Sequence, residues 1–177
     1  VWLVGAGPGD PELLTLKAVR AMREAQVVLI DDLVNPAVLE HYPNARVIPV
    51  GKRGGCRSTP QAFINRLMLR YGRQGKRLVR LKGGDPCIFG RGGEEAEWLA
   101  QRGIEVELVN GITAGLAGAT QCGISLTQRG VARGVTLVTA HTLDGSSPEW
   151  HALAKTGTTL VLYMGVSSLQ QVQLGLM

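Results

Sequence analysis

The most informative segment of this chain is LVRLKGGDPCIFGRGGEE, residues 78–95. It opens as a short apolar strand, breaks at Gly83-Gly84-Asp85-Pro86 and breaks again at residues 90–93. It ends in acidic residues that suit the first turn of a helix, near the positive end of the helix dipole. Glycines cost backbone entropy on folding, and an ordinary tight turn explains only one or two of these. Because ligands of α/β sheets bind beyond the carboxyl ends of strands, we expect a ligand to lie against this loop.

Apolar strands alternate with helical patterns on both sides of this stretch. Asp10 is a good N-cap and Pro11 a good first helical residue, so the pattern predicts a helix from there to about Ala25. The alternation favours an α/β fold with mostly parallel sheets. Strands are expected at residues 1–4, 27–30, 46–50, 77–81, 105–109, 135–139 and 158–163.

The composition changes after residues 110–113, where small residues follow in AGLAGATQCG. This change predicts an N-terminal α/β domain at residues 1–111 and the start of a second α/β domain at residues 112–177. The chain begins directly on a strand without Met and ends inside a helical pattern. We therefore expect a fragment whose second domain is truncated.

The net charge of +5 fits an acidic ligand, nucleic acid or simply a solvated basic surface. Aromatic residues are scarce and no block of Lys and Arg occurs, which argues against nucleic acid as a partner. Basic residues instead gather in glycine-rich loops, which suits a small polyanionic substrate. These residues are Lys52, Arg53, Arg57, Lys82, Arg91, Arg129 and Arg133.

The three cysteines are odd in number and widely spaced. They form no metal-binding pair, so we expect no metal site, and lone thiols fit a reducing cytoplasm. No apolar run approaches the ~18 residues of a membrane span. The chain also opens without a signal peptide, so we expect a cytoplasmic protein with no membrane partner.

The first loop, GAGPGDP at residues 5–11, invites an alternative from another class of enzyme. Its Gly-x-Gly follows a strand, and Asp31 ends the next strand where a ribose-binding acid of a nicotinamide-dependent oxidoreductase would lie. However, Asp10 would face the pyrophosphate, and Pro8 removes a backbone donor. GPGDP at 7–11 also resembles GGDP at 83–86, and both loops are expected to open toward the same end of the sheet.

Several single residues have two interpretations. Asp31 and Asp32 stand at a strand's carboxyl end, as a base or as a capped turn. Lys52 follows a strand and is equally compatible with a solvated lysine. Thr113 offers a hydroxyl to a polar ligand or caps a helix. Met164, after a strand, suits edge-of-core packing as well as a site.

Four stretches agree in order with one family, at residues 4–18, 50–55, 78–95 and 108–118. They resemble the tetrapyrrole methylases, over nearly the whole chain. The resemblance implies two α/β domains with the site in a cleft between them, and a homodimer. It implies methyl transfer from S-adenosyl-L-methionine, leaving S-adenosyl-L-homocysteine, to C-2 and C-7 of uroporphyrinogen III. The product would be precorrin-2, on the route to sirohaem and cobalamin; a cobalt-precorrin methyltransferase is the nearest alternative.

The resemblance also assigns roles to residues. Asp31 matches the proton acceptor and Lys52 the proton donor. This chain departs from the family at Asp32, where Arg or Ala is usual, at Gln128 in place of His, and at Ala140 in place of Gly. The residues implied to hold the methyl donor are Pro8, Gly83, Gly84, Asp85, Ile88, Thr113, Ala114 and Met164, with Asp85 accepting from an amine or hydroxyl of the donor.

Overall fold

The computed structural model describes residues 1–41, 44–51, 59–140 and 146–177. The chain forms two compact units, Val1–Ala114 and Gly115–Met177. The sequence predicted the division after residue 111. Both units are α/β, and every strand pair within their sheets is parallel.

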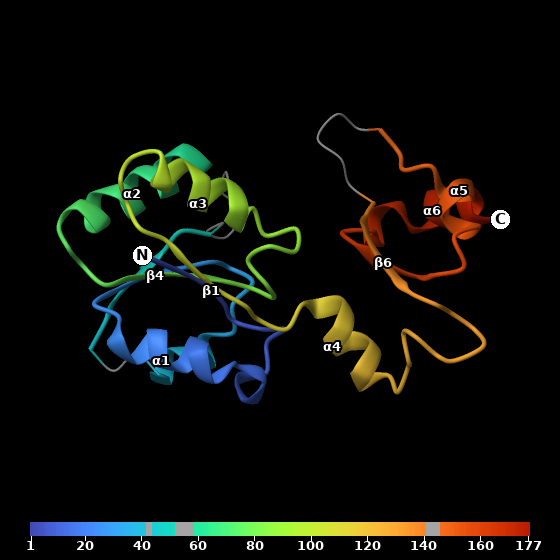
Figure 1. Cartoon of the computed structure of the whole chain (residues 1–177), viewed down its shortest axis with the longest axis horizontal. Coiled ribbons are helices and arrows are strands. Elements are labelled where there is room, and N and C mark those ends of the chain that lie inside the picture. Colours follow the sequence, from blue (N-terminus) through green and yellow to red (C-terminus); the bar gives the residue numbers. More distant parts are fainter. Residues whose placement is uncertain (42–43, 52–58, 141–145) are drawn as a thin grey trace. The chain divides into compact units, whose positions relative to one another are not determined.

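The first unit is built on a five-stranded sheet in the order β3-β2-β4-β1-β5 (Figure 1). β4 lies at its centre, between β1 and β2, so the loop after β4 leaves from the middle of the carboxyl edge. That position gives it neighbours on both sides. The strands are β1 (Trp2–Gly5), β2 (Val27–Ile30), β3 (Arg46–Pro49), β4 (Leu78–Lys82) and β5 (Glu107–Val109).

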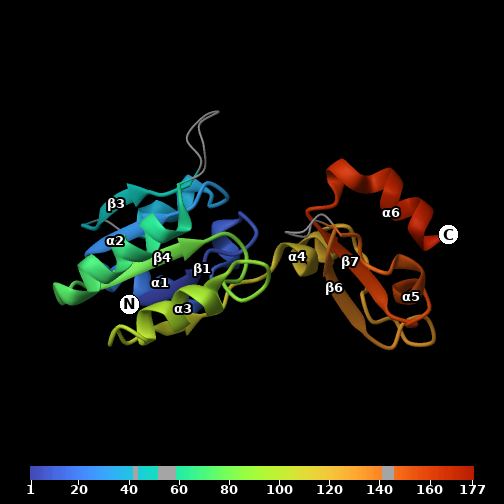
Figure 2. The same cartoon turned by 90° about the horizontal axis from the view of Figure 1, so that it is seen from above.

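Helices cover both faces of this sheet (Figures 1 and 2). One face carries α1 (Leu16–Glu24) and the 3₁₀ helix η2 (Pro36–His41), and the other carries α2 (Gln61–Arg73) and α3 (Gly92–Ala100). The resulting three layers follow from strands that are apolar on both sides, as expected of a parallel sheet.

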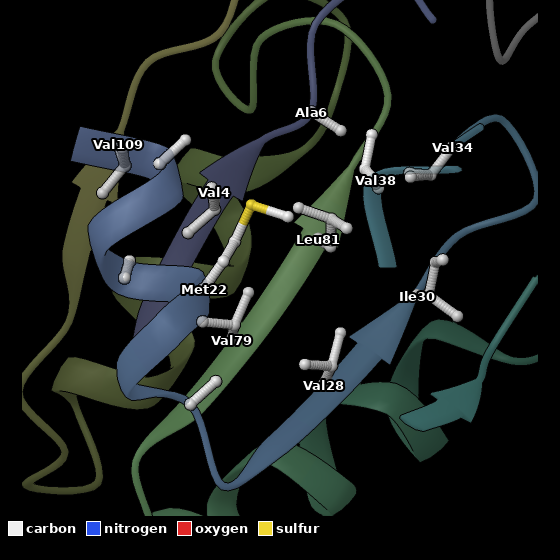
Figure 3. Close-up of a cluster of buried hydrophobic side chains, with 13 residues drawn as sticks. Val4, Ala6, Met22, Val28, Ile30, Val34, Val38, Val79, Leu81 and Val109 are labelled. Carbon is white, nitrogen blue, oxygen red and sulfur yellow. The ribbon is translucent and has the colours of Figure 1, made fainter. Parts of the chain in front are cut away.

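Two hydrophobic clusters fill the space between the layers. Figure 3 shows the first, in which Met22 of α1 packs near Val4, Val79 and Leu81 of the sheet. The second lies under α2 and α3. Since successive strand residues point to opposite faces, β1, β2 and β4 each contribute residues to both clusters. The second cluster comprises Leu3, Val27, Leu29, Val50, Ile64, Met68, Leu78 and Leu99.

The helix expected from Pro11 begins later, at Leu16. Pro11–Leu13 form only a 3₁₀ turn, η1, in which the Asp10 carboxylate accepts from the Glu12 amide at 2.9 Å. Thr15 then caps α1 by accepting from the amide of Ala18 at 3.1 Å. Asp10 and Thr15 are both capping residues, five positions apart, and the regular helix starts only after Thr15. A side chain such as that of Thr15 competes with main-chain hydrogen bonds inside a helix, so it favours a helix start at its own position.

The second unit contains a parallel pair, β6 (Val135–Thr139) and β7 (Thr159–Tyr163). Around it lie α4 (Ala114–Gln121), α5 (Trp150–Ala154), η3 (Val166–Ser168) and α6 (Leu169–Leu176). The amide of Gly115 donates to the Tyr163 hydroxyl at 3.0 Å. A Cβ at Gly115 would lie 2.6 Å from that hydroxyl, so only glycine lets α4 approach β7 this closely. Across the described parts of both units, no helix has the length and apolar character needed to traverse a bilayer.

Candidate functional site

The two glycine-rich loops meet at the carboxyl edge of the sheet. The Gly7 amide donates to the Gly84 carbonyl at 3.2 Å, and the Gly84 amide donates to the Gly7 carbonyl at 2.7 Å. Both glycines have a positive φ, of 71° and 67°, which disfavours other residues. The similar motifs at 7–11 and 83–86 therefore open toward the same end of the sheet, as predicted.

A third glycine closes this junction. A Cβ on Gly5 would lie 2.5 Å from the Gly111 amide nitrogen and 2.6 Å from the Gly84 carbonyl oxygen. The main chains at the ends of β1, β4 and β5 therefore approach one another so closely that a side chain at Gly5 would not fit.

Asp85 joins the loop after β4 to the segment after β5. Its carboxylate is buried and accepts from the Cys87 amide at 2.8 Å, the Asn110 side-chain amide at 3.1 Å and the Gly111 amide at 3.2 Å. We call this set of Asp85, Cys87, Asn110 and Gly111 the Asp85 clasp. Three internal donors engage the carboxylate that the resemblance assigned to the methyl donor, so holding the two loops together is the role that its geometry supports.

The loop after β4 also contains unusual backbone. Phe89 and Arg91 have φ values of 52° and 58°. Each such non-glycine conformation costs on the order of 1–3 kcal/mol and is concentrated at functional sites. The Gly92 amide donates to the Pro86 carbonyl at 2.8 Å and closes this turn. In the second unit Met164, directly after β7, has the same kind of conformation, with φ of 56°.

Seven of the expected donor-binding residues belong to the first unit. Pro8 adjoins Gly7, and Ile88 follows the clasp; both are half-buried. The position of a Cβ on Gly84 lies 3.8 Å from the Thr113 Cα and 3.9 Å from the Ala114 nitrogen. Loops after β1, β4 and β5 therefore place these seven residues along one stretch of the sheet edge: Pro8, Gly83, Gly84, Asp85, Ile88, Thr113 and Ala114.

Met164, the eighth expected donor-binding residue, lies in the second unit. It is exposed at the carboxyl end of β7, with 55% of its surface accessible. Edge-of-core packing, the other interpretation of this residue, does not fit a thioether side chain so open to solvent.

Asp31 follows β2, which pairs with β4. Its carboxylate is a third exposed and accepts from the Arg80 guanidinium at 3.1 Å. The turn beyond it is tied to the first loop, because the Asn35 side-chain amide donates to the Gly9 carbonyl at 2.7 Å. Lys52, the expected proton donor, lies outside the described residues, as do Arg53 and Arg57.

The sequence did not predict a buried polar group between β4, α2 and α3. The carboxylate of Glu95 is fully buried, 3.1 Å from the Lys82 ammonium and 2.8 Å from the Gln61 side-chain amide that donates to it. We call the residues Asp31, Gln61, Arg80, Lys82 and Glu95 the Glu95 cluster. Arg80 and Lys82 alternate with Leu81 and so share one face of β4, the face that α2 and α3 cover.

Two of the cations expected to bind substrate form ion pairs with glutamates of α3 instead. Lys82 is buried in the strand, and burial, followed by the charge of Arg80, lowers the pKa of its ammonium. Arg91 donates twice to the Glu94 carboxylate, at 2.6 and 2.9 Å, and this contact lowers the pKa of Glu94 and raises that of Arg91. Arg129 and Arg133, in the second unit, are exposed.

The dinucleotide alternative loses its structural basis here. It requires a helix whose N-terminus faces the pyrophosphate. The first loop leads instead into the short η1, and regular helix starts only at Leu16. As for metals, the part of the chain that the structure describes contains no group of three His, Cys, Asp or Glu residues placed to bind an ion.

Comparison with known proteins agrees with this geometry. A family model described as Tetrapyrrole (Corrin/Porphyrin) Methylases matches residues 1–177. A uroporphyrinogen-III C-methyltransferase of Pseudomonas aeruginosa is 73% identical over all of this chain and 72% of that protein. The crystal structure of uroporphyrin-III C-methyl transferase from Thermus thermophilus with S-adenyl homocysteine superposes with a TM-score of 0.82 at 44% identity, covering 99% of this chain and 74% of that one. A cobalt precorrin-4 methyltransferase structure has a TM-score of 0.85 at 29% identity, covering 99% and 72%.

Proposed function

This chain belongs to the tetrapyrrole (corrin/porphyrin) methylase family, and we propose the following activity for it. It is a methyltransferase that uses S-adenosyl-L-methionine to methylate ring carbons of uroporphyrinogen III. The observation that carries the substrate is the 73% identity, over the whole chain, to a uroporphyrinogen-III C-methyltransferase. Fold similarity does not separate this substrate from a cobalt precorrin, because the two TM-scores are 0.82 and 0.85, but identity does, at 44% against 29%.

The methyl donor is proposed to lie along the glycine-lined edge. When bound, S-adenosyl-L-methionine supplies a methyl group already activated on a sulfonium. The chain has to bind and orient it, which accounts for much of what an enzyme contributes to a reaction between two bound partners. Gly83 and Gly84 carry no side chains and are flanked by Pro8, Ile88, Thr113 and Ala114, and this segment is proposed as that surface. Met164 is assigned to the donor by the resemblance and supported by its strained backbone.

Proton transfer at the ring is proposed for Asp31 and Lys52. The Asp31 carboxylate is partly exposed at the sheet edge and is held by Arg80, as a positioned base has to be. The role of Lys52 rests on the resemblance alone. Asp85 is proposed to act indirectly, by keeping the donor loop in place through its clasp.

The protein is further proposed to be a homodimer and to be cytoplasmic. The resemblance supports a homodimer, and the lone thiols support a cytoplasmic protein. Light scattering of the full-length protein tests the first: a molar mass of twice the chain mass is expected, and a single chain mass would contradict it.

Incubation of the full-length protein with uroporphyrinogen III and S-adenosyl-L-methionine, without oxygen, tests the activity. Mass spectrometry is expected to show a product heavier by two methyl groups, with S-adenosyl-L-homocysteine released. The Asp31→Asn variant is expected to slow this reaction while still binding S-adenosyl-L-homocysteine. Methylation of a cobalt precorrin but not of uroporphyrinogen III would overturn the substrate assignment.

A further inference from the structure

The Glu95 carboxylate is the most deeply buried charge that the proposed chemistry does not use. None of its surface is accessible, and it lies on α3 beneath the sheet edge. A buried carboxylate requires compensation by partners. Here Lys82 and Gln61 contact it at 3.1 and 2.8 Å, and the Arg80 Nε lies 3.6 Å away. Buried ion pairs add little stability compared with well-packed apolar residues, so their placement calls for another explanation.

Arg80 connects this buried charge with the partly exposed Asp31. Its Nη2 lies 3.1 Å from the Asp31 carboxylate, and its Nη1 donates to the Leu81 carbonyl at 3.2 Å. The third edge of the guanidinium, Nε, faces Glu95 and has no hydrogen-bond partner among the residues that the structure describes. Because a guanidinium is planar and rigid, anchoring its inner edge orients its outer edge.

The cluster is also balanced in charge. Two carboxylates, Asp31 and Glu95, face two cations, Arg80 and Lys82, and the Gln61 amide links Glu95 to Asn65 of the same helix, α2. Lys82 contacts Oε2 of Glu95, whereas Gln61 and the Arg80 Nε lie near Oε1. Removing the charge of Glu95 would therefore release Arg80 to move toward other acceptors.

We propose that Glu95 is a positioning residue for methyl transfer, holding the Arg80 guanidinium so that the Asp31 carboxylate keeps one fixed place at the sheet edge. The inference rests on the proposed function, because it takes Asp31 as the proton acceptor. Glu95 is buried and has no access to substrate, yet its substitution is expected to change turnover. The hydrogen bonds of the Asp85 clasp involve none of the residues of the Glu95 cluster, so binding of the methyl donor is expected to be left unchanged.

The test is a double-mutant cycle in the full-length protein, with kcat for uroporphyrinogen III and the Kd for S-adenosyl-L-homocysteine as readouts. Glu95→Gln keeps the side-chain volume and is expected to lower kcat about tenfold to a hundredfold, the cost of a small misplacement of a reacting group. The Kd is expected to stay within a factor of two or so of the starting value. Glu94→Gln, one residue away and exposed, is the matched control and is expected to leave both unchanged.

The most informative variant of the cycle combines Glu95→Gln with Asp31→Asn. If Glu95 acts through Asp31, the second substitution adds no further loss of kcat, because residues that act as a unit are not additive. Additive losses, or a loss of kcat matched by a loss of donor binding, would overturn the inference. Failure of the unchanged protein to methylate uroporphyrinogen III would instead overturn the proposed function.

A second variant keeps the inference testable if Glu95→Gln does not fold. Arg80→Met, Lys82→Met and Glu95→Met together replace the buried charges with apolar side chains, which proteins often tolerate. This triple variant is expected to fold and to bind S-adenosyl-L-homocysteine, yet to show the low kcat of Arg80→Met alone. Turnover equal to that of the unchanged protein would overturn the inference.

Discussion

Asp85, in the loop after β4, and Glu95, in the helix α3 that follows this loop, are two buried carboxylates whose partners differ in kind. Asp85 accepts from two backbone amides and one side-chain amide, all neutral. Glu95 faces two cations and one neutral amide. The Asp85 clasp thus ties separate backbone segments together, whereas the Glu95 cluster fixes side chains relative to one another.

The two kinds of partner suit two different tasks at one sheet edge. A ligand that lies on main chain needs loops of constant shape, and neutral amide donors provide this without adding charge. A proton acceptor needs a fixed carboxylate, and a rigid guanidinium anchored from behind provides that. Among the described residues the two groups share no hydrogen bond, so each can be altered separately.

The largest effect is expected from removing the carboxylate of the Glu95 cluster. Glu95→Leu leaves Lys82 as a buried cation without its carboxylate partner and removes one of the two carboxylates near Arg80. Breaking a buried pair in this way costs about 3–5 kcal/mol of the free energy of unfolding. Urea denaturation measures the loss. A change below about 1 kcal/mol, the size typical of surface ion pairs, would mean that the cluster is not buried as described.

A smaller effect on stability is expected at the Asp85 clasp. Asp85→Asn turns one acceptor edge into a donor that faces the Gly111 and Asn110 donors. Leaving buried donors unpaired costs about 1–3 kcal/mol. Urea denaturation is again the measurement. Asp10→Asn, which alters an exposed cap, is the control and should change stability by only a few tenths of a kcal/mol. Equal losses in the two variants would remove the distinction between clasp and surface.

The pH dependence of stability distinguishes the Glu95 cluster from the Asp85 clasp, because only the Glu95 cluster contains a lysine. Burial lowers the pKa of Lys82 below its ordinary value of 10.5. Between the lowered pKa and 10.5 the unfolded chain binds more protons, so the stability contributed by this group rises as pH rises. The free energy of unfolding of the unchanged protein, relative to Lys82→Met, is therefore expected to increase toward pH 10.5. A constant difference would contradict the burial of a charged Lys82.

The smallest effect is expected at Glu107, a surface carboxylate that serves as a reference. It contacts Lys17 at 2.7 Å and the Trp2 indole at 2.9 Å, and the hydrogen bond from Lys17 is the main cause of its lowered pKa. The stabilisation is present above the ordinary value of 4.5 and is lost as pH falls through the lowered pKa. Glu107→Gln is expected to cost about 0.5 kcal/mol at neutral pH and nothing in strong acid, by thermal denaturation. A cost that persists in acid would contradict this ion pair.

Local sequence patterns predicted the positions of the strands and the glycine-rich loops that follow them. The GPGDP and GGDP motifs predicted two loops at one sheet edge, and Gly7 and Gly84 pair there directly. The helix start was misplaced because the Asp10-Pro11 pattern suits a 3₁₀ turn as well as a helix. Thr15, the true cap of α1, was a second capping residue that sequence alone could not rank above the first.

The two buried carboxylates show where sequence reasoning stops. Acids in the first turn of a helix are explained by the helix dipole, so Glu95 gave no reason to expect burial. The alternation of Arg80 and Lys82 in β4 was an available signal that both face the same helices. The contact of Asp85 with Asn110, 25 residues away, depends on the pairing of β4, β1 and β5 and has no local pattern.

Calorimetric titration of S-adenosyl-L-homocysteine into the full-length protein and its Asp85→Asn variant tests most directly the claim that the clasp holds the donor loop. We expect binding to the unchanged protein, a loss of affinity of at least about tenfold, or 1.4 kcal/mol, in the variant, and no heat with NAD. Equal affinity in both proteins would contradict the role of the clasp. Binding of NAD in place of S-adenosyl-L-homocysteine would contradict the methyltransferase assignment itself.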